Sequence, residues 1–328
     1  MAAAKKEGKL VTMSVEGSGY RKVADAFHEA FPEIEVEHAT ILARNWAPRV
    51  LQERSAGLYE WDVVGPPAIT AFGTLWPVKV FDPIRPLLFR PDVVDDKNWQ
   101  GGLEFGFADD AKQYAFGYTW DLQVNLHINT DLVRDDEIKS AKDLANPKWK
   151  GRIAMADPRT GGASATPMTI ARLKHGPEII KQLVNDQEPI MFAQSRQIAE
   201  AVVRGKVAIA IGTTNRVVLD FKNEGLARNI KNPILEDFAY LASEVMWLMN
   251  RAPHPNAAKL YVNWLLSKEG QEIFSKSTER NSRRTDVPPV DQDTTPPEGA
   301  AKRFMDPLRQ AVYPEVEVTR ELTREWLK

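Results

Sequence analysis

Residues 8–38 read GKLVTMSVEGSGYRKVADAFHEAFPEIEVEH, and this stretch decides the fold. It opens with a short β-run over Lys9–Val15, which is followed by the turn-forming residues 16–19. Apolar residues then recur every three or four positions through Tyr20–Phe31, which predicts a helix with one buried face. A proline ends this helix, and Ile34–His38 has the pattern of a second strand. The β-α-β order predicts a parallel sheet, with the first loop at the carboxyl ends of its strands.

The rest of the chain continues this alternation in two blocks. A long extended stretch, Tyr114–Asn129, leaves the first block, and the strand–loop–helix pattern then starts again. A last extended stretch, Tyr240–Asn250, mirrors the first as a return path. We therefore predict an α/β fold of two lobes, each a mostly parallel sheet flanked by helices, joined by a two-crossing hinge with a ligand cleft between them. The predicted lobes comprise residues 1–122 with 248–328, and residues 123–247.

Composition limits the functions that the chain can have. It has 328 residues, of which 43 are basic and 45 acidic, and a net charge of −2 without any block of like charge. Proteins that bind nucleic acid cluster Lys and Arg on one face, so a nucleic-acid partner is not expected. The absence of cysteine excludes thiol nucleophiles, disulfides and cysteine–zinc sites. No apolar run approaches the ~20 residues that cross a bilayer.

Catalytic constellations are also missing from the sequence. The five histidines are scattered, without a pair at metal-ligand spacing. There is no Gly-x-Ser-x-Gly elbow, and Gly17-Ser18-Gly19 is only a fragment of a dinucleotide-binding loop. Carboxylate pairs such as Asp109-Asp110 lie in polar stretches that are typical of solvated loops. We therefore predict a binding protein that catalyses nothing and needs neither a cofactor nor a metal.

Three loops that follow strands are candidate ligand contacts, because helix N-termini there present free amides and partial positive charge. In the first loop, small residues let a ligand approach the backbone; the candidates are Ser18 and Gly19. The second combines a guanidinium with a glycine-rich loop, and its candidates are Arg159, Thr160, Gly161, Gly162 and Ser164. The third offers hydroxyls and an amide at a helix start, from Thr213, Thr214 and Asn215. Helix capping, or for Arg159 a surface ion pair, explains the same residues without a ligand.

Further candidates lie on the facing wall of the first lobe and at the two crossings. They are Gly65 and Pro66 on the wall, Tyr118 and Trp120 near the first crossing, and Glu244 and Trp247 at the second. Aromatic side chains at a crossing either stack on a ligand or pack the hinge. Arg283 and Arg284 either reach the cleft or lie solvated on the surface, and solvation is favoured. Thr166-Pro167 fits an N-cap followed by the first residue of a helix.

Short phrases spread over most of the chain carry a family resemblance. They are residues 8–11 (GKLV), 26–36 (AFHEAFPEIEV), 61–64 (WDVV), 124–133 (VNLHINTDLV), 143–153 (DLANPKWKGRI), 255–259 (PNAAK), 267–272 (SKEGQE) and 281–288 (NSRRTDVP). In this order and spacing they resemble the bacterial extracellular solute-binding proteins of ABC importers. The group that they resemble contains binders of ferric ion, thiamine, polyamines, phosphonates and sugar phosphates.

The resemblance implies a type II periplasmic-binding-protein fold and a role in transport. Such a protein captures a small molecule by lobe closure and delivers it to an ABC permease in the cytoplasmic membrane. The resemblance also implies a monomer in the periplasm, or otherwise outside the cytoplasm, whose signal peptide has been removed. A small anion that carries phosphate, phosphonate or carboxylate is the expected solute, because basic side chains and helix amides neutralise it without proton transfer.

Other solutes and one other class of function remain open at this point. The ferric binders of this group hold iron with two adjacent tyrosines, but Tyr-Tyr never occurs here, and residues 220–240 contain only Tyr240. A polyamine would need carboxylates, for which Asp62, Asp121 and Glu244 are available. A transferase on a related two-lobed scaffold would normally need a cysteine for its cofactor. A sensor domain would need a helix-turn-helix partner, which is not attached.

Lobe closure makes a prediction about the dimensions of the protein in solution. Small-angle X-ray scattering should give a smaller radius of gyration at saturating solute than without solute. The physical reason is that a ligand shifts the equilibrium toward the closed state by its higher affinity for that state. Equal radii at saturating solute would contradict closure.

Overall fold

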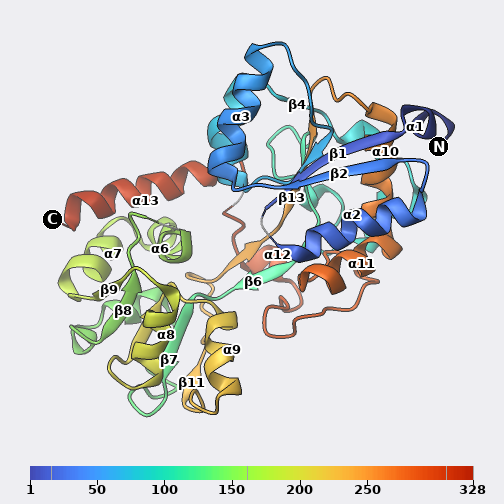
Figure 1. The fold of residues 1–328 in the computed structure, drawn as a ribbon. Coiled ribbons are helices and arrows are strands. Elements are labelled where there is room, and N and C mark those ends of the chain that lie inside the picture. The colour runs from blue at the N-terminus through green and yellow to red at the C-terminus, as the bar shows by residue number, and fades with distance from the viewer. Residues whose placement is uncertain (16, 161, 308, 328) are drawn as a thin grey trace. The chain divides into compact units, whose positions relative to one another are not determined.

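The structure, a computed structural model, describes residues 1–15, 17–160, 162–307 and 309–327, and Figure 1 shows its helices and strands. The chain forms two compact units. Unit 1 consists of Met1–Asp121, Ala242–Ala301 and Leu308–Tyr313, and unit 2 of Leu122–Leu241, Lys302–Pro307 and Pro314–Lys328. The chain thus leaves unit 1 after Asp121 and returns at Ala242, where the sequence predicts crossings after residues 122 and 247.

Unit 1 is built on a sheet with the strand order β2-β1-β3-β13-β4, and β5 also pairs with β13. Its strands are β1 (Lys9–Ser14), β2 (Glu35–Thr40), β3 (Val63–Val64), β4 (Phe81–Asp82), β5 (Ala115–Gly117) and β13 (Val245–Met249). β1 runs parallel to β2 and β3, whereas β13 runs antiparallel to β3, β4 and β5. The sheet is therefore mixed and not mostly parallel, because the strand that returns from unit 2 enters it in the opposite direction.

Helices cover both faces of this sheet. They are α1 (Ala2–Glu7), α2 (Ser18–Ala30), α3 (Ala43–Ser55), α4 (Ala68–Thr70), α5 (Pro91–Val94), α10 (Pro255–Leu265) and α11 (Lys268–Thr278), with short π or 3₁₀ turns at Ala71–Leu75, Trp76–Val78, Arg85–Leu87, Asp96–Asn98 and Glu104–Gly106. One core cluster includes Leu10 and Phe27, and the other includes Val11 and Trp247. Because consecutive residues of β1 point to opposite faces, the two clusters lie on opposite sides of the sheet.

Unit 2 has a five-stranded sheet with the order β11-β7-β10-β8-β9. Its strands are β7 (Leu126–Asn129), β8 (Ile153–Ala156), β9 (Ile190–Phe192), β10 (Ile209–Ile211) and β11 (Ile230–Lys231). Its helices are α6 (Gly162–His175), α7 (Glu178–Lys181), α8 (Ser195–Val203) and α9 (Asn215–Asn223), with 3₁₀ or π turns at Ala141–Ala145, Pro147–Trp149 and Gln182–Asp186. β8 runs parallel to β9 and β10, and β7 runs antiparallel to β10 and β11. This sheet is also mixed, since β7 is the strand that enters from unit 1.

Two short strands, β6 (Asp121–Gln123) and β12 (Tyr240–Ala242), contain the two connections and pair with each other. The extended stretch Tyr114–Asn129 therefore consists of three strands, β5, β6 and β7, interrupted at residues 118–120 and 124–125. The stretch Tyr240–Asn250 likewise consists of β12 and β13.

The C-terminal helix α13 (Tyr313–Trp326) packs in unit 2 from Pro314 onward, although the sequence predicts all of 248–328 in lobe 1. Thr319 is fully buried, and its hydroxyl lies 2.9 Å from that of Thr169 on α6. Arg172 donates to the same hydroxyl over 3.0 Å and forms an ion pair with Glu315. These buried polar contacts hold α13 on α6. No pattern in the sequence predicts them. The remaining helix, α12 (Ala300–Arg303), lies at a unit boundary.

The predicted start of α6 is wrong. The helix begins at Gly162, so that Pro167 lies inside it and Thr166 is not its N-cap. A proline inside a helix leaves the carbonyl four residues earlier without its usual N–H donor. Here that carbonyl belongs to Ala163, and the side-chain amide of Asn125 donates to it over 3.0 Å. This bond offsets the cost of the proline.

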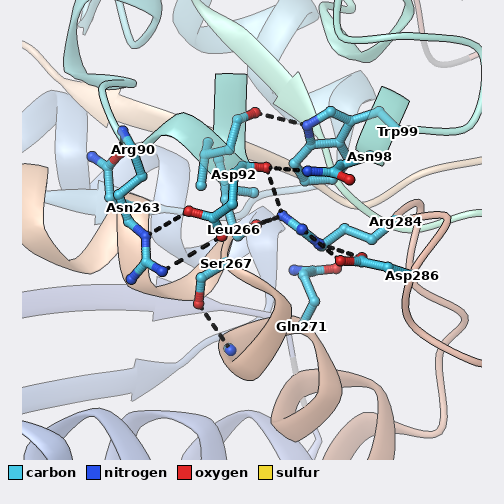
Figure 2. A network of polar contacts seen from close by, with 12 residues as sticks. Arg90, Asp92, Asn98, Trp99, Asn263, Leu266, Ser267, Gln271, Arg284 and Asp286 are labelled. Atoms are coloured by element: carbon cyan, nitrogen blue, oxygen red, sulfur yellow. Dashed lines mark hydrogen bonds and ion pairs between the residues drawn. The ribbon is translucent and has the colours of Figure 1, made fainter. Parts of the chain in front are cut away.

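Arg283 and Arg284 are buried in unit 1, not solvated, with 0% and 2% of their surface exposed. The Arg284 guanidinium lies between Asp92, Leu266 and Asp286, as Figure 2 shows. It donates to the Leu266 carbonyl over 2.9 Å and to both carboxylate oxygens of Asp286 over 2.8 and 2.9 Å. These hydrogen bonds and the Asp286 carboxylate offset the free-energy cost of burying the Arg284 charge. Asp109 is also buried, because its carboxylate caps the backbone N–H groups of residues 113–115.

Gly19 packs α2 against α11, and this explains its lack of a side chain. A Cβ at Gly19 would lie 2.1 Å from the Ser277 carbonyl oxygen, which is too close for any residue that has a side chain. The close approach of the two helices, which lie side by side in Figure 1, requires glycine here whether or not a ligand binds nearby.

We predict that Gly19→Ala lowers the free energy of unfolding by about 1–3 kcal/mol, because the helices must separate to admit the methyl group. Urea denaturation measures this change. Gly73→Ala is the matched control, since its Cβ would meet Tyr313 at an ordinary 3.7 Å. Equal stabilities of the two variants would contradict the packing role of Gly19.

Candidate functional site

Unit 1 has a cavity of about 30 Å³ where β1, β2 and β3 end, enough for about two water molecules. Its lining includes Ser14, Tyr20, His38, Gly65, Tyr118 and Glu244. Three of these, Gly65, Tyr118 and Glu244, are predicted ligand contacts, and the fold brings them together from three separate segments. Whether they touch a solute stays a prediction.

His38 joins the polar groups at the end of β1. Its Nδ1 lies 2.8 Å from the Thr12 hydroxyl, and its Nε2 lies 3.1 Å from the Ser14 hydroxyl. Burial, and then the charge of Arg21, lower the pKa of His38 to about 4, so the ring is neutral at pH 7. The Ser14 hydroxyl donates to the Val15 carbonyl over 3.0 Å, so it accepts from Nε2–H. The Thr12 hydroxyl then donates to Nδ1, and the ring has one defined tautomer.

Glu244 lies between β12 and β13 and is the centre of a second polar group. Tyr20 donates to one of its carboxylate oxygens, and Tyr118 donates to the other over 3.3 Å. Nε of Arg280 lies 3.5 Å from the first oxygen. Burial raises the pKa of Glu244, while Arg280 and the two tyrosines oppose this shift. Burial, and then the charge of Glu244, raise the pKa of Tyr20 and of Tyr118, so both remain neutral phenols.

Asp121 adds a second carboxylate to this group. Only 4% of its side chain is exposed, and Nη1 of Arg280 lies 4.0 Å from it. The Asn281 N–H and the Thr294 hydroxyl each donate to Oδ1 over 3.3 Å. Burial raises the pKa of Asp121 to about 6, and Arg280 counteracts part of this shift. Unit 1 therefore holds two carboxylates around a single guanidinium.

In unit 2, Arg159 is held by Asp157. Its Nε and Nη2 donate to the two carboxylate oxygens over 2.9 and 2.8 Å, and this contact lowers the pKa of Asp157. Arg320 of α13 donates to the Arg159 carbonyl over 3.0 Å. The structure thus contains the ion pair that was the alternative explanation of Arg159. Its side chain remains 41% exposed. The Thr160 hydroxyl donates back to the Asp157 carbonyl over 3.0 Å.

The starts of α6 and α9 lie close to each other in unit 2. A Cβ at Gly212, where φ is +90°, would lie 2.7 Å from the Ala156 Cβ and 3.2 Å from the Ser164 Cβ. The buried Ser164 hydroxyl donates to the Ala156 carbonyl over 2.7 Å. Thr213 is fully buried with its hydroxyl 2.9 Å from that of Ser195. Glycine at 212 is thus required both by the backbone conformation and by the packing.

The third loop ends at α9. Thr214 is its N-cap residue, but the Thr214 side chain makes no capping bond, so the capping alternative fails at this position. Asn215, the first residue of the helix, accepts a hydrogen bond from His127 of β7 over 3.0 Å. Burial lowers the pKa of His127 to about 4, so this ring is also neutral.

The other predicted contacts are spread over both units. Ser18 is exposed at the start of α2, Pro66 is buried after β3, and Gly162 begins α6. Trp120 lines a different cavity of unit 1, of about 260 Å³, together with Pro288 and Pro289. Gly161 lies outside the described residues.

Trp247 is a core residue rather than a candidate contact. Its ring lies 4.4 Å from that of Phe81, measured between centroids, and none of its surface is exposed. Trp247 and Met246 are neighbours on β13 and point to opposite faces of the sheet. Met246 lines the cavity, and Trp247 does not. Asp62, a carboxylate considered for polyamines, is also internal: it accepts from the Val11 N–H over 2.8 Å and from the His254 N–H over 2.7 Å.

The sequence analysis did not predict several polar side chains that lie beside the predicted ligand contacts. Tyr20, His38 and Arg280 surround the predicted residues in unit 1, and His127 does so in unit 2. The only available signal was position: Tyr20 follows the first loop directly, and His38 lies in the second strand. Nothing local marks Arg280 or His127.

Two further features concern residues 1–15, 17–160, 162–307 and 309–327. Among these residues no group of three or more His, Asp or Glu side chains is arranged to hold a metal ion. Within them, every helix is too short or too polar to span a lipid bilayer.

The raised pKa of Asp121 predicts a pH dependence of stability. The folded protein binds this proton more tightly than the unfolded chain does, so the stabilisation is complete below the ordinary pKa of 3.8 and is lost as the pH rises through about 6. Asp121→Asn should remove this loss. We expect the free energy of unfolding of the variant to rise relative to wild type by about 2–3 kcal/mol between pH 4 and 7.

Urea denaturation at several pH values measures this difference. Asp110→Asn, which neutralises an exposed carboxylate, is the control and should follow the wild-type profile. Parallel profiles for Asp121→Asn and wild type would show that Asp121 titrates alike in the folded and unfolded states.

Part of the chain is similar in sequence to known proteins. Residues 125–277 match the family model described as bacterial extracellular solute-binding protein. An uncharacterized protein of Haemophilus influenzae is 31% identical over 160 residues, which cover 45% of this chain and 44% of that protein. The match thus spans less than half the length of this curated relative.

Solved structures resemble the chain over nearly all of its length. IdiA (FutA) of Trichodesmium, in complex with iron and citrate ligands, has a TM-score of 0.74 at 15% identity, with 97% of this chain and 99% of that chain covered. The periplasmic binding protein AfuA of Actinobacillus pleuropneumoniae, with fructose-6-phosphate bound, has a TM-score of 0.61 at 16% identity, with 98% of each chain covered. At these identities the likeness shows the fold, and it confirms the predicted α/β class. The chain therefore has the type II periplasmic-binding-protein fold, and the part of it over residues 125–277 is similar to the bacterial extracellular solute-binding proteins.

Proposed function

We propose that the chain is the extracytoplasmic substrate-binding component of an ABC-type uptake system and that its solute carries a phosphate, phosphonate or carboxylate group. The match of residues 125–277 supports the general role. The ligands named for the two similar structures, citrate with iron and fructose-6-phosphate, both carry such groups. In this proposal the loaded protein docks on a membrane permease and catalyses no reaction.

One observation supports an anionic solute. It is the pattern of charged residues at the starts of the helices that follow strands. None of the six such helices of nine or more residues, α2, α3, α6, α8, α9 and α10, has an acidic residue in its first turn. Four of them instead have an arginine at this place in the sequence: Arg21, Arg44, Arg196 and Arg216. By contrast, α11 and α13 have Glu269 and Glu315 at their starts.

This pattern is unfavourable for the free protein. A positive side chain at the positive end of a helix dipole costs about 0.3–1 kcal/mol relative to a negative one. Intramolecular pairs relieve part of the cost, since Arg21 contacts Asp25 at 2.9 Å and Arg196 contacts Glu224 at 3.5 Å. An anion at the carboxyl edges of the sheets would gain from both the helix dipoles and the guanidinium groups. Arg159 is a weaker donor than the sequence suggests, because Asp157 already neutralises it.

A ferric ion is the second candidate, and one observation favours it. Tyr20, Tyr118 and Glu244 line the same cavity, and phenolate and carboxylate oxygens are ligands for hard metal ions. The raised pKa values of the two tyrosines oppose phenolate formation. A polyamine is less favoured than either, because Arg280 already supplies the cation that faces Glu244 and Asp121.

Thermal denaturation with candidate solutes tests the proposal. We expect inorganic phosphate, citrate or fructose-6-phosphate to raise the melting temperature progressively with concentration. A ligand at 100 times its dissociation constant stabilises the folded state by about 2.7 kcal/mol. Spermidine and ferric chloride complete the panel. Stabilisation by spermidine alone contradicts the anionic solute, and stabilisation by ferric ion alone, with a visible phenolate–iron absorption band, establishes the second candidate.

A variant makes this test specific to the helix starts. Ser18→Asp places a carboxylate in the first turn of α2, where it should stabilise the free protein through the helix dipole and repel an anion. The solute-induced rise in melting temperature should therefore shrink. Gln52→Glu, the same change in charge at an exposed position late in α3, should leave the rise intact.

A further inference from the structure

We propose that His127 and Asn232 hold the side-chain amide of Asn215 in one orientation, so that the start of α9 presents only hydrogen-bond donors to the solute. The inference rests on the proposed function and narrows it. The solute atom that meets α9 is an oxygen of an anionic group and not a metal ion, because N–H groups cannot coordinate a cation. His127 and Asn232 act as positioning residues.

The contacts that orient Asn215 come from two other parts of unit 2. His127 lies on β7, opposite Ala210 of β10, and its Nε2 is 3.0 Å from Oδ1 of Asn215. Asn232, just after β11, donates its side-chain amide to the same oxygen. Two donors on one oxygen assign the other end of the Asn215 amide, its NH₂ group, to the side away from them.

The orientation of the Asn215 amide determines the tautomer of His127. Only 1% of His127 is exposed, and burial lowers its pKa to about 4, so the ring carries a single N–H at pH 7. Because Nε2 faces a carbonyl oxygen, that proton is on Nε2. Nδ1 then carries a lone pair and no proton, and it is buried without a partner among the residues described.

The reversed arrangement is less favourable. If both amides were turned over, Asn215 would donate to Nε2, and the proton of His127 would move to Nδ1. That would bury an N–H donor without an acceptor, which proteins tolerate less well than an unused lone pair. The reversed arrangement would also point Oδ1 of Asn215 outward and make the start of α9 suitable for a cation.

The outward face of Asn215 has unused donors. Within the described chain no acceptor contacts its NH₂ group, and the N-cap Thr214 makes no side-chain bond to the helix amides. The first intrahelical bond at this end runs from the Val218 N–H to the Thr214 carbonyl, so the preceding N–H groups of α9 have no helical acceptor. The side-chain amide and these backbone groups together form a set of donors that suits an oxyanion.

Variants of His127 and Asn215 test the inference, with inorganic phosphate and citrate as probes. His127→Phe removes the donor to Asn215. It should weaken binding of whichever probe raises the melting temperature at least about tenfold, as expected for a lost hydrogen bond to a charged group. His127→Gln keeps an N–H donor and should restore affinity to within about threefold of wild type. Asn215→Asp replaces the donors with an acceptor and should abolish anion binding. Isothermal titration measures the affinities, and urea denaturation measures the stability of each variant.

Nuclear magnetic resonance supplies a readout that folding alone does not change. The ring ¹⁵N shifts of His127 should show Nε2–H, and the Asn215 NH₂ signals, assigned by their absence in Asn215→Asp, should shift when either probe is added. Protonation at Nδ1, equal affinities for His127→Phe and His127→Gln, or Asn215 signals that neither probe moves would each overturn the inference. If a probe still raises the melting temperature in that case, the proposed function stands without it. If no anion stabilises the protein, the proposed function itself fails.

Discussion

A carboxylate removed from water must be hydrogen-bonded or neutralised, and the centre of unit 1 is organised around this requirement at Glu244. Its partners are Tyr20 from α2, Tyr118 from the stretch after β5, and Arg280 after α11. These segments are far apart in sequence, and each must be placed correctly before the charge can be buried. The burial of one acidic side chain beside the returning strand therefore links α2, the segment after α11 and the sheet.

The returning strand of the mixed sheet in unit 1 also places Glu244. Glu244 directly precedes β13, so the returning chain passes the cavity before it pairs with β3. Met246 then lines the cavity from β13, and Trp247 points to the opposite core cluster. One strand thus contributes both to the polar centre and to the aromatic packing, with alternate side chains serving each.

Local pattern was enough to predict the β-α-β unit over residues 8–38, because periodicity and a terminating proline act within a few residues. It was not enough for the start of α6, since the group that satisfies Ala163 is the side chain of Asn125, a partner distant in sequence. The burial of Arg283 and Arg284 was missed for a related reason. Their acceptors are mostly backbone carbonyls and a carboxylate that only the fold assembles.

The candidate site shows the same limit. The sequence predicts Gly65, Tyr118 and Glu244, which the fold brings to one cavity, but it also assigns a ligand-related role to Gly19, which packing explains. Polarity in a loop identifies groups that are able to bind. It does not identify which of them are already used, as the Asp157–Arg159 pair illustrates.

The anchoring of α13 on α6 has a practical consequence for labelling. Because the first helix belongs to unit 1 and the last to unit 2, a fluorescent donor at one terminus and an acceptor at the other would be attached to different units. Energy transfer between the two dyes would then report their separation directly, without any substitution in the interior of the protein.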